Sequence, residues 1–222
     1  FINGGQTCIA PDYLLIHKSV KEKFISHFKD EVFRAYGENP QTSEDYPRIV
    51  NTRNFDRLAL MLENEQFLIG GQTEREDRYI APTIIDEPSL DSEVMKGEIF
   101  GPIFPLISYE NEQDIATTLA KYDKPLALYV FTTRNKFAKK MIADYSFGGG
   151  TINDTTVHFA NHRLPFGGVG ESGIGSYHGK RTFDLFSHKK GVVRRYNWLD
   201  LPVRYAPYKG KLKQLKTLMK IG

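Results

Sequence analysis

The most reactive side chain of the sequence is its one cysteine, Cys8. It closes a glycine-rich segment that reads Asn3-Gly4-Gly5-Gln6-Thr7-Cys8. Glycines let a backbone approach a ligand closely, and a cysteine thiolate is a strong nucleophile where its surroundings lower its pKa. A single cysteine cannot build a zinc site of the CxxC kind, so we expect no metal centre. The segment is therefore either a nucleophile in a binding loop or a buried, inert thiol, and composition alone does not separate the two.

A second candidate is the segment Glu98-Ile99-Phe100-Gly101-Pro102. A glutamate carboxylate can accept two hydrogen bonds from a diol such as a ribose, and the Gly-Pro turn after it can hold it at the edge of a site. Taken alone the signal is weak, because glutamates are mostly solvated.

The third candidate is residues 164–179, where six of the 19 glycines fall within 16 residues. Residues 168–173 match the pattern G-x-G-x-x-G. A dinucleotide fingerprint must follow a strand and open a helix, with an acidic residue about 20 positions later. Here Leu164-Pro165 comes before the glycines, so we interpret the segment as a loop that allows close packing or lines a ligand channel.

Alternating strand and helix patterns must position these segments. Apolar runs predict strands at 13–17, 67–69, 79–85, 103–109, 126–132 and 151–153. Helical periodicity predicts a helix that a Ser19–Glu22 capping box opens and Gly37 ends. Further helices are predicted over 51–64, after Asn111 and over 134–145. This order predicts an α/β fold with a mainly parallel sheet flanked by helices.

Composition and charge exclude several classes of protein. The 222 residues are 40% hydrophobic and 26% charged, which is typical of a globular protein and not of a disordered or fibrous one. One cysteine excludes a disulfide framework and favours a reduced, cytoplasmic setting. The net charge is +3, yet residues 204–222 carry six basic and no acidic residues, so residues 1–203 carry −3. We therefore expect no nucleic-acid surface, and no apolar stretch is long enough for a membrane span.

In combination, the three segments resemble the aldehyde dehydrogenase superfamily. Asn3-x-Gly5-Gln6-x-Cys8 resembles its catalytic cysteine motif, Glu98–Pro102 resembles its cofactor-contacting motif, and residues 164–168 with Gly173 resemble its C-terminal signature. The runs 5–13, 152–154, 176–180 and 186–188 favour the class 3 branch. The resemblance extends from Phe1 to about Val193.

The resemblance implies a three-layer aldehyde dehydrogenase catalytic domain over residues 1–190 and an oligomerisation strand with a basic tail over 191–222. It implies oxidation of an aldehyde to a carboxylic acid with NAD or NADP, in a homodimer. Cys8 would be the nucleophile. The cofactor would contact Glu98, Phe100 and Phe166, and Asn3 and Asn153 would belong to the substrate site or its wall. His158, His162 and His178 receive no role.

The resemblance also implies that the phosphate-binding loop, the Asn of the oxyanion hole and the Glu that activates water lie before the cysteine motif. Only seven residues precede Cys8, so we expect the 222-residue chain alone to be inactive in aldehyde oxidation. Two alternatives stay open. One is a cysteine esterase or acyl-transferase, and the other is a non-enzymatic assembly or regulatory module that has kept the fold.

Overall fold

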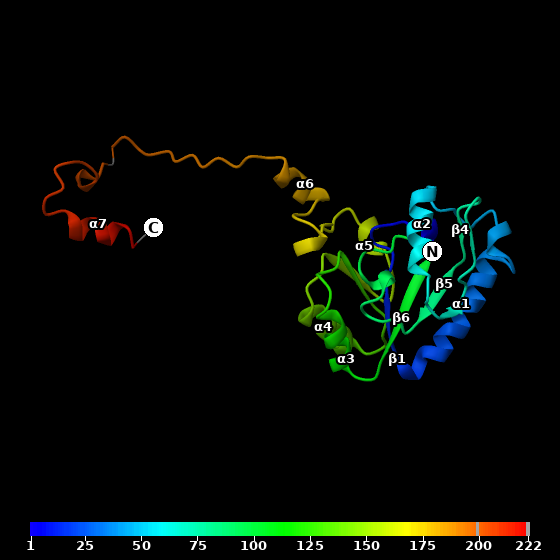
Figure 1. Cartoon of the computed structure of the whole chain (residues 1–222). Helices are drawn as coiled ribbons and strands as arrows, with labels where there is room; N and C mark the ends of the chain where they lie inside the picture. The colour runs from blue at the N-terminus through cyan, green and yellow to red at the C-terminus, as the bar shows by residue number, and fades with distance from the viewer. Residues whose placement is uncertain (199, 221–222) are drawn as a thin grey trace. The chain divides into compact units, whose positions relative to one another are not determined.

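The structure is a computed structural model that describes residues 1–198 and 200–220 (Figure 1). It divides into two compact units, Phe1–Phe186 and Ser187–Gly222. All three candidate segments lie in the first unit, and each unit is described by itself.

A four-stranded sheet forms the centre of the first unit, in the order β1-β6-β5-β2. β1 (Leu14–His17) and β5 (Thr83–Asp86) both pair in parallel with β6 (Ile103–Tyr109), and β2 (Phe67–Ile69) pairs antiparallel with β5 at the edge. The register sets Leu14 opposite Leu106 and Thr83 opposite Ile103. The N-terminal ends of β1, β5 and β6 therefore lie side by side at one end of the sheet.

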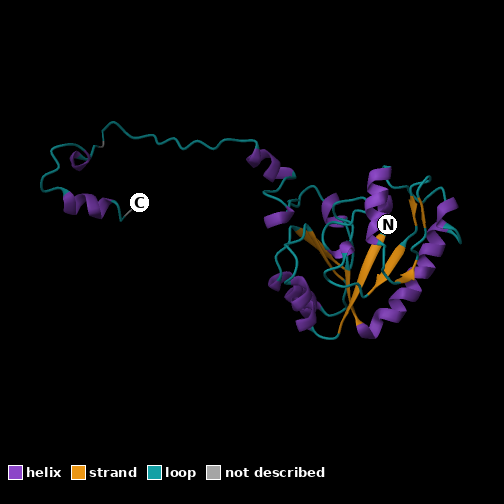
Figure 2. Ribbon diagram, in the orientation of Figure 1, coloured by secondary structure: helices purple, strands orange, loops and turns teal. Residues whose placement is uncertain are grey.

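Helices cover both faces of this sheet (Figure 2). Successive side chains of a strand point to opposite faces, so Ile84 packs with α1 (Lys21–Tyr36) while Ile85 packs with α2 (Thr52–Met61). The two cores are closed, since Leu58 of α2 and both isoleucines are fully buried. This arrangement of helix, sheet and helix confirms the predicted three-layer α/β architecture.

A second group of elements packs beside β1 and β6. β7 (Ala127–Val130) pairs in parallel with β8 (Gly149–Ile152), and α3 (Glu112–Leu119) and α4 (Asn135–Asp144) join the same core. The parallel pairings are thus divided between two sheets. Besides several 3-10 helices, this unit contains the short elements β3 (Thr73–Glu74), β4 (Tyr79–Ile80), α5 (Val157–Ala160) and α6 (Gly179–Leu185).

Two local predictions are wrong. The Ser19–Glu22 capping box does not form: α1 begins at Lys21 without a side-chain cap, because Ser19 lies in a 3-10 turn and its N–H donates to His17 Nδ1 at 3.2 Å. The predicted strand over 79–85 is two strands, because Pro82 has no N–H to donate to a ladder. By contrast, Asn111 caps α3 as predicted, and Gly37 ends α1 with a φ of 76°.

In the second unit, residues 187–198 form no helix or strand, and a helix, α7, spans Leu212–Leu218. Val192 and Val193 are exposed, Val193 to 94%. The role predicted for residues 191–222 stays a prediction. None of the described helices is both long enough and apolar enough to cross a membrane.

Candidate functional site

The parallel pairing of β1 and β6 explains why two distant motifs meet. Residues 8–12 lead into β1 and residues 98–102 lead into β6. Because the two strands are parallel neighbours, the segments before them reach the same end of the sheet, where both strands begin. This is the contact that the strand pattern alone could not predict, since it does not give strand order.

The two segments touch through glycines. Gly5 has a left-handed φ of 74°, and a Cβ placed there would lie 2.1 Å from the carbonyl oxygen of Gly101. A Cβ on Gly101 would in turn lie 2.5 Å from the Leu58 side chain. A larger residue at position 5 would force the two backbones apart, whereas one at position 101 would collide with the Leu58 side chain. Gly5 is therefore required by the approach of the cysteine loop to the Glu98–Pro102 loop, and Gly101 by the packing of that loop against α2.

The side chain of Gln6 ties the cysteine loop to the segment before α2. Its Nε2 donates to the carbonyl oxygens of Asn3 at 3.0 Å and Arg48 at 3.1 Å, and its Oε1 accepts from the Val50 N–H at 2.9 Å. Asn3 has a left-handed φ of 53°, and its Nδ2 donates to the Gln6 carbonyl oxygen at 3.0 Å. Asn3 and Gln6 thus stabilise the loop by donating hydrogen bonds to each other's carbonyl oxygen.

A cavity of about 690 Å³ opens beside the cysteine loop. Its wall includes the exposed thiol of Cys8, the Glu98 carboxylate and the Phe100 ring, which is 38% exposed. The lining also includes the apolar strand β7 and residues from α3 and α4. β7 is only partly buried, because it lines this cavity. A nucleophile, a carboxylate and an aromatic ring therefore share one largely apolar hollow.

Tyr129 of β7 anchors the cysteine loop from the other side. Its hydroxyl donates to the Ile9 carbonyl oxygen at 2.7 Å, and burial raises the pKa of the phenol. Within the described part of the chain the N–H of Cys8 donates no hydrogen bond, whereas those of Thr7 and Ala10 donate within the loop. The Cys8 N–H is thus available to an oxygen bound beside its thiol.

The sequence analysis missed two charged residues of this site, Asp12 and Arg57. Asp12 lines the cavity, and its Oδ1 accepts from the Ile99 N–H at 2.9 Å. Burial raises the pKa of its carboxyl to about 6, and the nearby Glu98 adds to the shift. Arg57 donates from Nη1 to the Glu98 carbonyl oxygen at 3.2 Å and from Nη2 to that of Ile99 at 2.6 Å. Asp12 stands between Pro11 and Tyr13, which was the available signal for it, whereas Arg57 follows Asp56 and had no such signal.

Phe166 and Asn153 do not line the cavity. Phe166 is buried between the rings of His158 and His178, each with its centroid 6.0 Å away. Asn153 follows β8 with a φ of 59°, and its Oδ1 accepts from the Thr132 N–H at 2.7 Å. The roles predicted for Phe166, Asn3 and Asn153 stay predictions.

The glycine-rich segment folds on itself. It contains only a three-residue 3-10 helix, Gly170–Ser172, and a Cβ on Gly168 would lie 2.1 Å from the Ser172 carbonyl oxygen. Residues 168–173, which match the G-x-G-x-x-G pattern, open no α-helix, and Gly168 serves close packing. The pattern is therefore not a dinucleotide fingerprint here.

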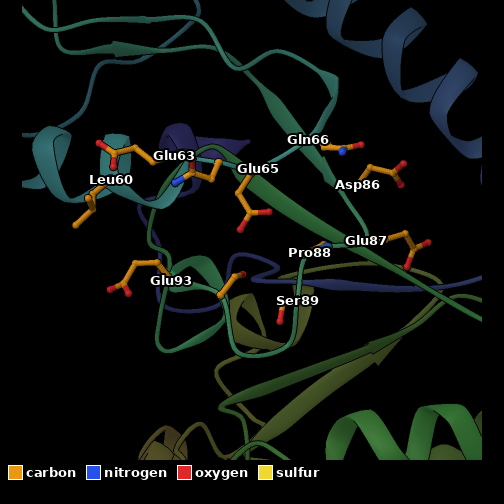
Figure 3. A pocket seen from close by; sticks show the side chains of 11 residues that line it. Leu60, Glu63, Glu65, Gln66, Asp86, Glu87, Pro88, Ser89 and Glu93 are labelled. Atoms are coloured by element: carbon orange, nitrogen blue, oxygen red, sulfur yellow. The ribbon is translucent and has the colours of Figure 1, made fainter.

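A second cavity of about 690 Å³ lies elsewhere in the first unit. Its wall carries the acidic residues Glu63, Glu65, Asp86, Glu87 and Glu93. Figure 3 shows these carboxylates spread around the hollow and pointing in different directions. Lys21 neutralises two of them, with Nζ 2.6 Å from Asp86 and 2.7 Å from Glu87. No group of three or more His, Cys, Asp or Glu among the described residues is arranged to hold a metal ion.

Comparisons with known proteins identify the family of the chain. The sequence profile of the aldehyde dehydrogenase family matches residues 1–192. The chain is 45% identical over 222 residues to 4,4'-diaponeurosporen-aldehyde dehydrogenase of Staphylococcus aureus, covering 99% of this chain and 48% of that relative. It is 43% identical over 214 residues to the dimeric NADP-preferring aldehyde dehydrogenase of Canis lupus familiaris, covering 96% and 47%.

A solved structure of Staphylococcus aureus AldH in a substrate-bound state superposes with a TM-score of 0.89 at 43% identity, covering 99% of this chain and 48% of that one. The chain thus spans about half the length of these relatives. A match to the family profile over most of the sequence, with the same fold in a solved relative, leads to one conclusion: the chain belongs to the aldehyde dehydrogenase family.

Proposed function

We propose that this chain supplies the nucleophile and the cofactor-facing loop of an NAD(P)-dependent aldehyde dehydrogenase that converts an aldehyde to a carboxylic acid. The observation that carries the proposal is the single cavity in which the Cys8 thiol, the Glu98 carboxylate and the Phe100 ring meet. The cavity's apolar wall suits an aldehyde with a hydrophobic body, because apolar lining with a few polar groups is the usual character of small-molecule sites.

Cys8 acts as the thiolate that adds to the aldehyde carbon. A C–S bond forms, the carbonyl π electrons move to oxygen, and the product is a thiohemiacetal. The free N–H of Cys8 donates to that developing oxyanion. NAD(P)⁺, when bound, supplies the hydride acceptor that makes the thiohemiacetal a thioester. Water then adds to the thioester carbon, and the C–S bond breaks to release the acid and the Cys8 thiol.

The residues present fit the nicotinamide half of the cofactor. Glu98 offers carboxylate oxygens at the cavity wall, which suit the two hydroxyls of a ribose. Phe100 presents a partly exposed ring at the same wall. Phe166 completes the proposal as a residue of the cofactor site, and Asn3 and Asn153 as residues of the substrate site or its wall. The canine relative is named as NADP-preferring, which supports a nicotinamide dinucleotide, NAD or NADP, as the cofactor.

The test is aldehyde-dependent NAD(P)H formation by the complete gene product that contains this sequence, compared with its Cys8→Ala variant. The proposal expects turnover that the variant loses. Equal turnover by both proteins would overturn it. The polypeptide of residues 1–222 by itself is expected to give no turnover, because it spans about half the length of its relatives.

We also propose that the complete gene product is a cytoplasmic homodimer and that Val192-Val193 adds a strand to the partner subunit. The support is the exposure of both valines in a stretch without helix or strand, and the canine relative is named as dimeric. An exposed lone thiol suits a reducing compartment. Light scattering tests the dimer: Val192→Asp with Val193→Asp should give monomers, and a monomeric parent protein would contradict the proposal.

A further inference from the structure

We propose that Asp12 and Arg57 are positioning residues that hold the backbone of Glu98 and Ile99 and thereby aim the Glu98 carboxylate at the cofactor. The inference rests on the proposed function and deepens it, since it concerns how the Glu98 carboxylate of the same site is held in position. Neither residue belongs to the motifs by which the site is recognised.

Asp12 binds the Glu98–Pro102 loop from the side of the cysteine loop. Its Oδ1 accepts from the Ile99 N–H at 2.9 Å, a contact across 87 residues of sequence. Asp12 follows Cys8 by four residues and lines the same cavity. A hydrogen bond to an ionised acceptor is shorter and stronger than one between neutral groups. The carboxylate thus connects the nucleophile's segment directly to the segment that carries Glu98.

Arg57 binds the same loop from the opposite side. It projects from α2, and its guanidinium donates to two successive carbonyl oxygens, at 3.2 Å for Glu98 and 2.6 Å for Ile99. A planar guanidinium holds two acceptors in fixed directions, which an ammonium group cannot do. Together with Asp12 it fixes three polar backbone atoms on two neighbouring residues.

The backbone after these contacts needs such support. Phe100 has a φ of 55°, a left-handed conformation that non-glycine residues adopt at a cost. Gly101 follows it and touches Gly5 of the cysteine loop. Without the two charged contacts the segment 98–100 can relax towards ordinary backbone angles, and this relaxation would move the Glu98 carboxylate.

A role in stability alone is a poor explanation for Asp12. Burying a carboxylate is costly, and here burial raises the pKa to about 6 while Glu98 adds repulsion and Arg57 offsets part of it. A neutral acceptor would hold the Ile99 N–H without the cost of burying a charge. Asp12 is a buried carboxylate at the point where the cysteine loop meets the Glu98–Pro102 loop. Buried groups with a shifted pKa are typical of functional sites.

The experiment uses the complete gene product and measures kcat and the KM for NAD(P)⁺ and for aldehyde. Asp12→Ala and Arg57→Met are expected to raise the KM for NAD(P)⁺ about tenfold, because each removes a charge-assisted hydrogen bond. Asp12→Asn keeps an acceptor oxygen and is expected to return the KM to within about threefold of the parent value. Lys21→Met, which breaks an ion pair at the acidic cavity, should lower the melting temperature and leave the KM for NAD(P)⁺ unchanged.

A double-mutant cycle separates positioning from general damage. If Asp12 acts through Glu98, then Asp12→Ala has little further effect on the KM for NAD(P)⁺ in a Glu98→Ala background. Full additivity, or a parent-like KM in both Asp12→Ala and Arg57→Met, would overturn the inference. If Arg57→Met does not fold, Arg57→Lys replaces it in the comparison, because it keeps the charge and loses the two fixed donors of the guanidinium. An active Cys8→Ala variant would instead refute the proposed function, so the two failures are distinguishable.

Discussion

Two cavities described in the first unit have the same volume, about 690 Å³, and different linings. One is lined by a thiol, a carboxylate and the apolar strand β7, and the other by several carboxylates that point in different directions (Figure 3). Size therefore says little about chemistry. What distinguishes the first cavity is that two backbone segments bring different reactive groups to one place.

The first cavity is also held more closely by its backbone. Gly5 and Gly101 allow contact without side chains between them, and Asp12 and Arg57 bind the carbonyl and amide groups of the same loop. At the acidic cavity, the contacts of Lys21 with Asp86 and Glu87 join side chains and do not hold the backbone. We therefore expect substitutions at the cavity beside Cys8 to affect activity more than matched substitutions at the acidic cavity.

The largest effect is expected from the nucleophile. Cys8→Ala in the complete gene product should lower kcat by at least about 10³-fold, because it removes the group that forms the covalent intermediate. The matched change in the other cavity, Glu63→Gln with Glu65→Gln, should leave kcat within about twofold, since surface substitutions away from a site rarely matter. Steady-state NAD(P)H formation measures both, and a comparable loss in the two variants would refute the distinction.

Gly5→Ala should come next. The added Cβ would overlap the Gly101 carbonyl oxygen at 2.1 Å, whereas Gly37, with nearly the same φ, has open space around it. Both alanines carry the strain of a positive φ, about 1–3 kcal/mol, but only Gly5→Ala adds overpacking of about 1–3 kcal/mol.

Urea unfolding of Gly5→Ala and Gly37→Ala gives the difference in their free energies of unfolding. We expect Gly5→Ala to be the less stable and also to lose activity, because its clash separates the two loops. Equal stability of the two variants would contradict the close contact.

Glu98→Gln should have a smaller effect that is confined to the cofactor. Loss of the charge weakens hydrogen bonds from the ribose hydroxyls, so the KM for NAD(P)⁺ should rise about tenfold. Glu65→Gln in the acidic cavity is the control. A rise in the aldehyde KM alone would show that Glu98 serves the substrate and not the cofactor.

The smallest effect concerns the pH dependence of stability. Burial raises the pKa of Asp12 from 3.8 to about 6 in the folded protein. Between these pH values the folded state therefore binds more protons than the unfolded state, and the stability due to Asp12 falls as the pH rises through this range. The loss is complete above about pH 6 and amounts to no more than about 3 kcal/mol.

Unfolding of the parent protein and Asp12→Asn at pH 5 and pH 8 measures this effect. The variant should gain stability relative to the parent at pH 8 and lose that advantage at pH 5. A difference that does not change with pH would show that the carboxyl titrates normally.

Much of the fold was predictable because its signals are local. The apolar runs of β1 and β6, and the caps at Asn111 and Gly37, act within a few residues, and the structure confirms them. The failures are local as well, but they depend on competing contacts. Ser19 binds His17 in place of the helix end, and Pro82 interrupts a run that reads as one strand.

The site was predictable only as separate pieces. The residue types at Cys8 and Glu98 indicated their chemistry, and the order of the motifs joined them. The partners that fix the loops, Asp12 and Arg57, could not be predicted, because their bonds to residues 98 and 99 depend on strand order and on which side of α2 faces the loop. Strand order is a tertiary property that periodicity does not contain.

The most direct test of the account is to find the covalent intermediate. The complete gene product, mixed with an aldehyde and NAD(P)⁺ and quenched in acid within milliseconds, should yield a Cys8 peptide heavier by the acyl group of that aldehyde. The Cys8→Ala variant should yield no acylated peptide. An acyl group on another residue, or product formed at the parent rate by the variant, would contradict the claim that Cys8 is the nucleophile of this cavity.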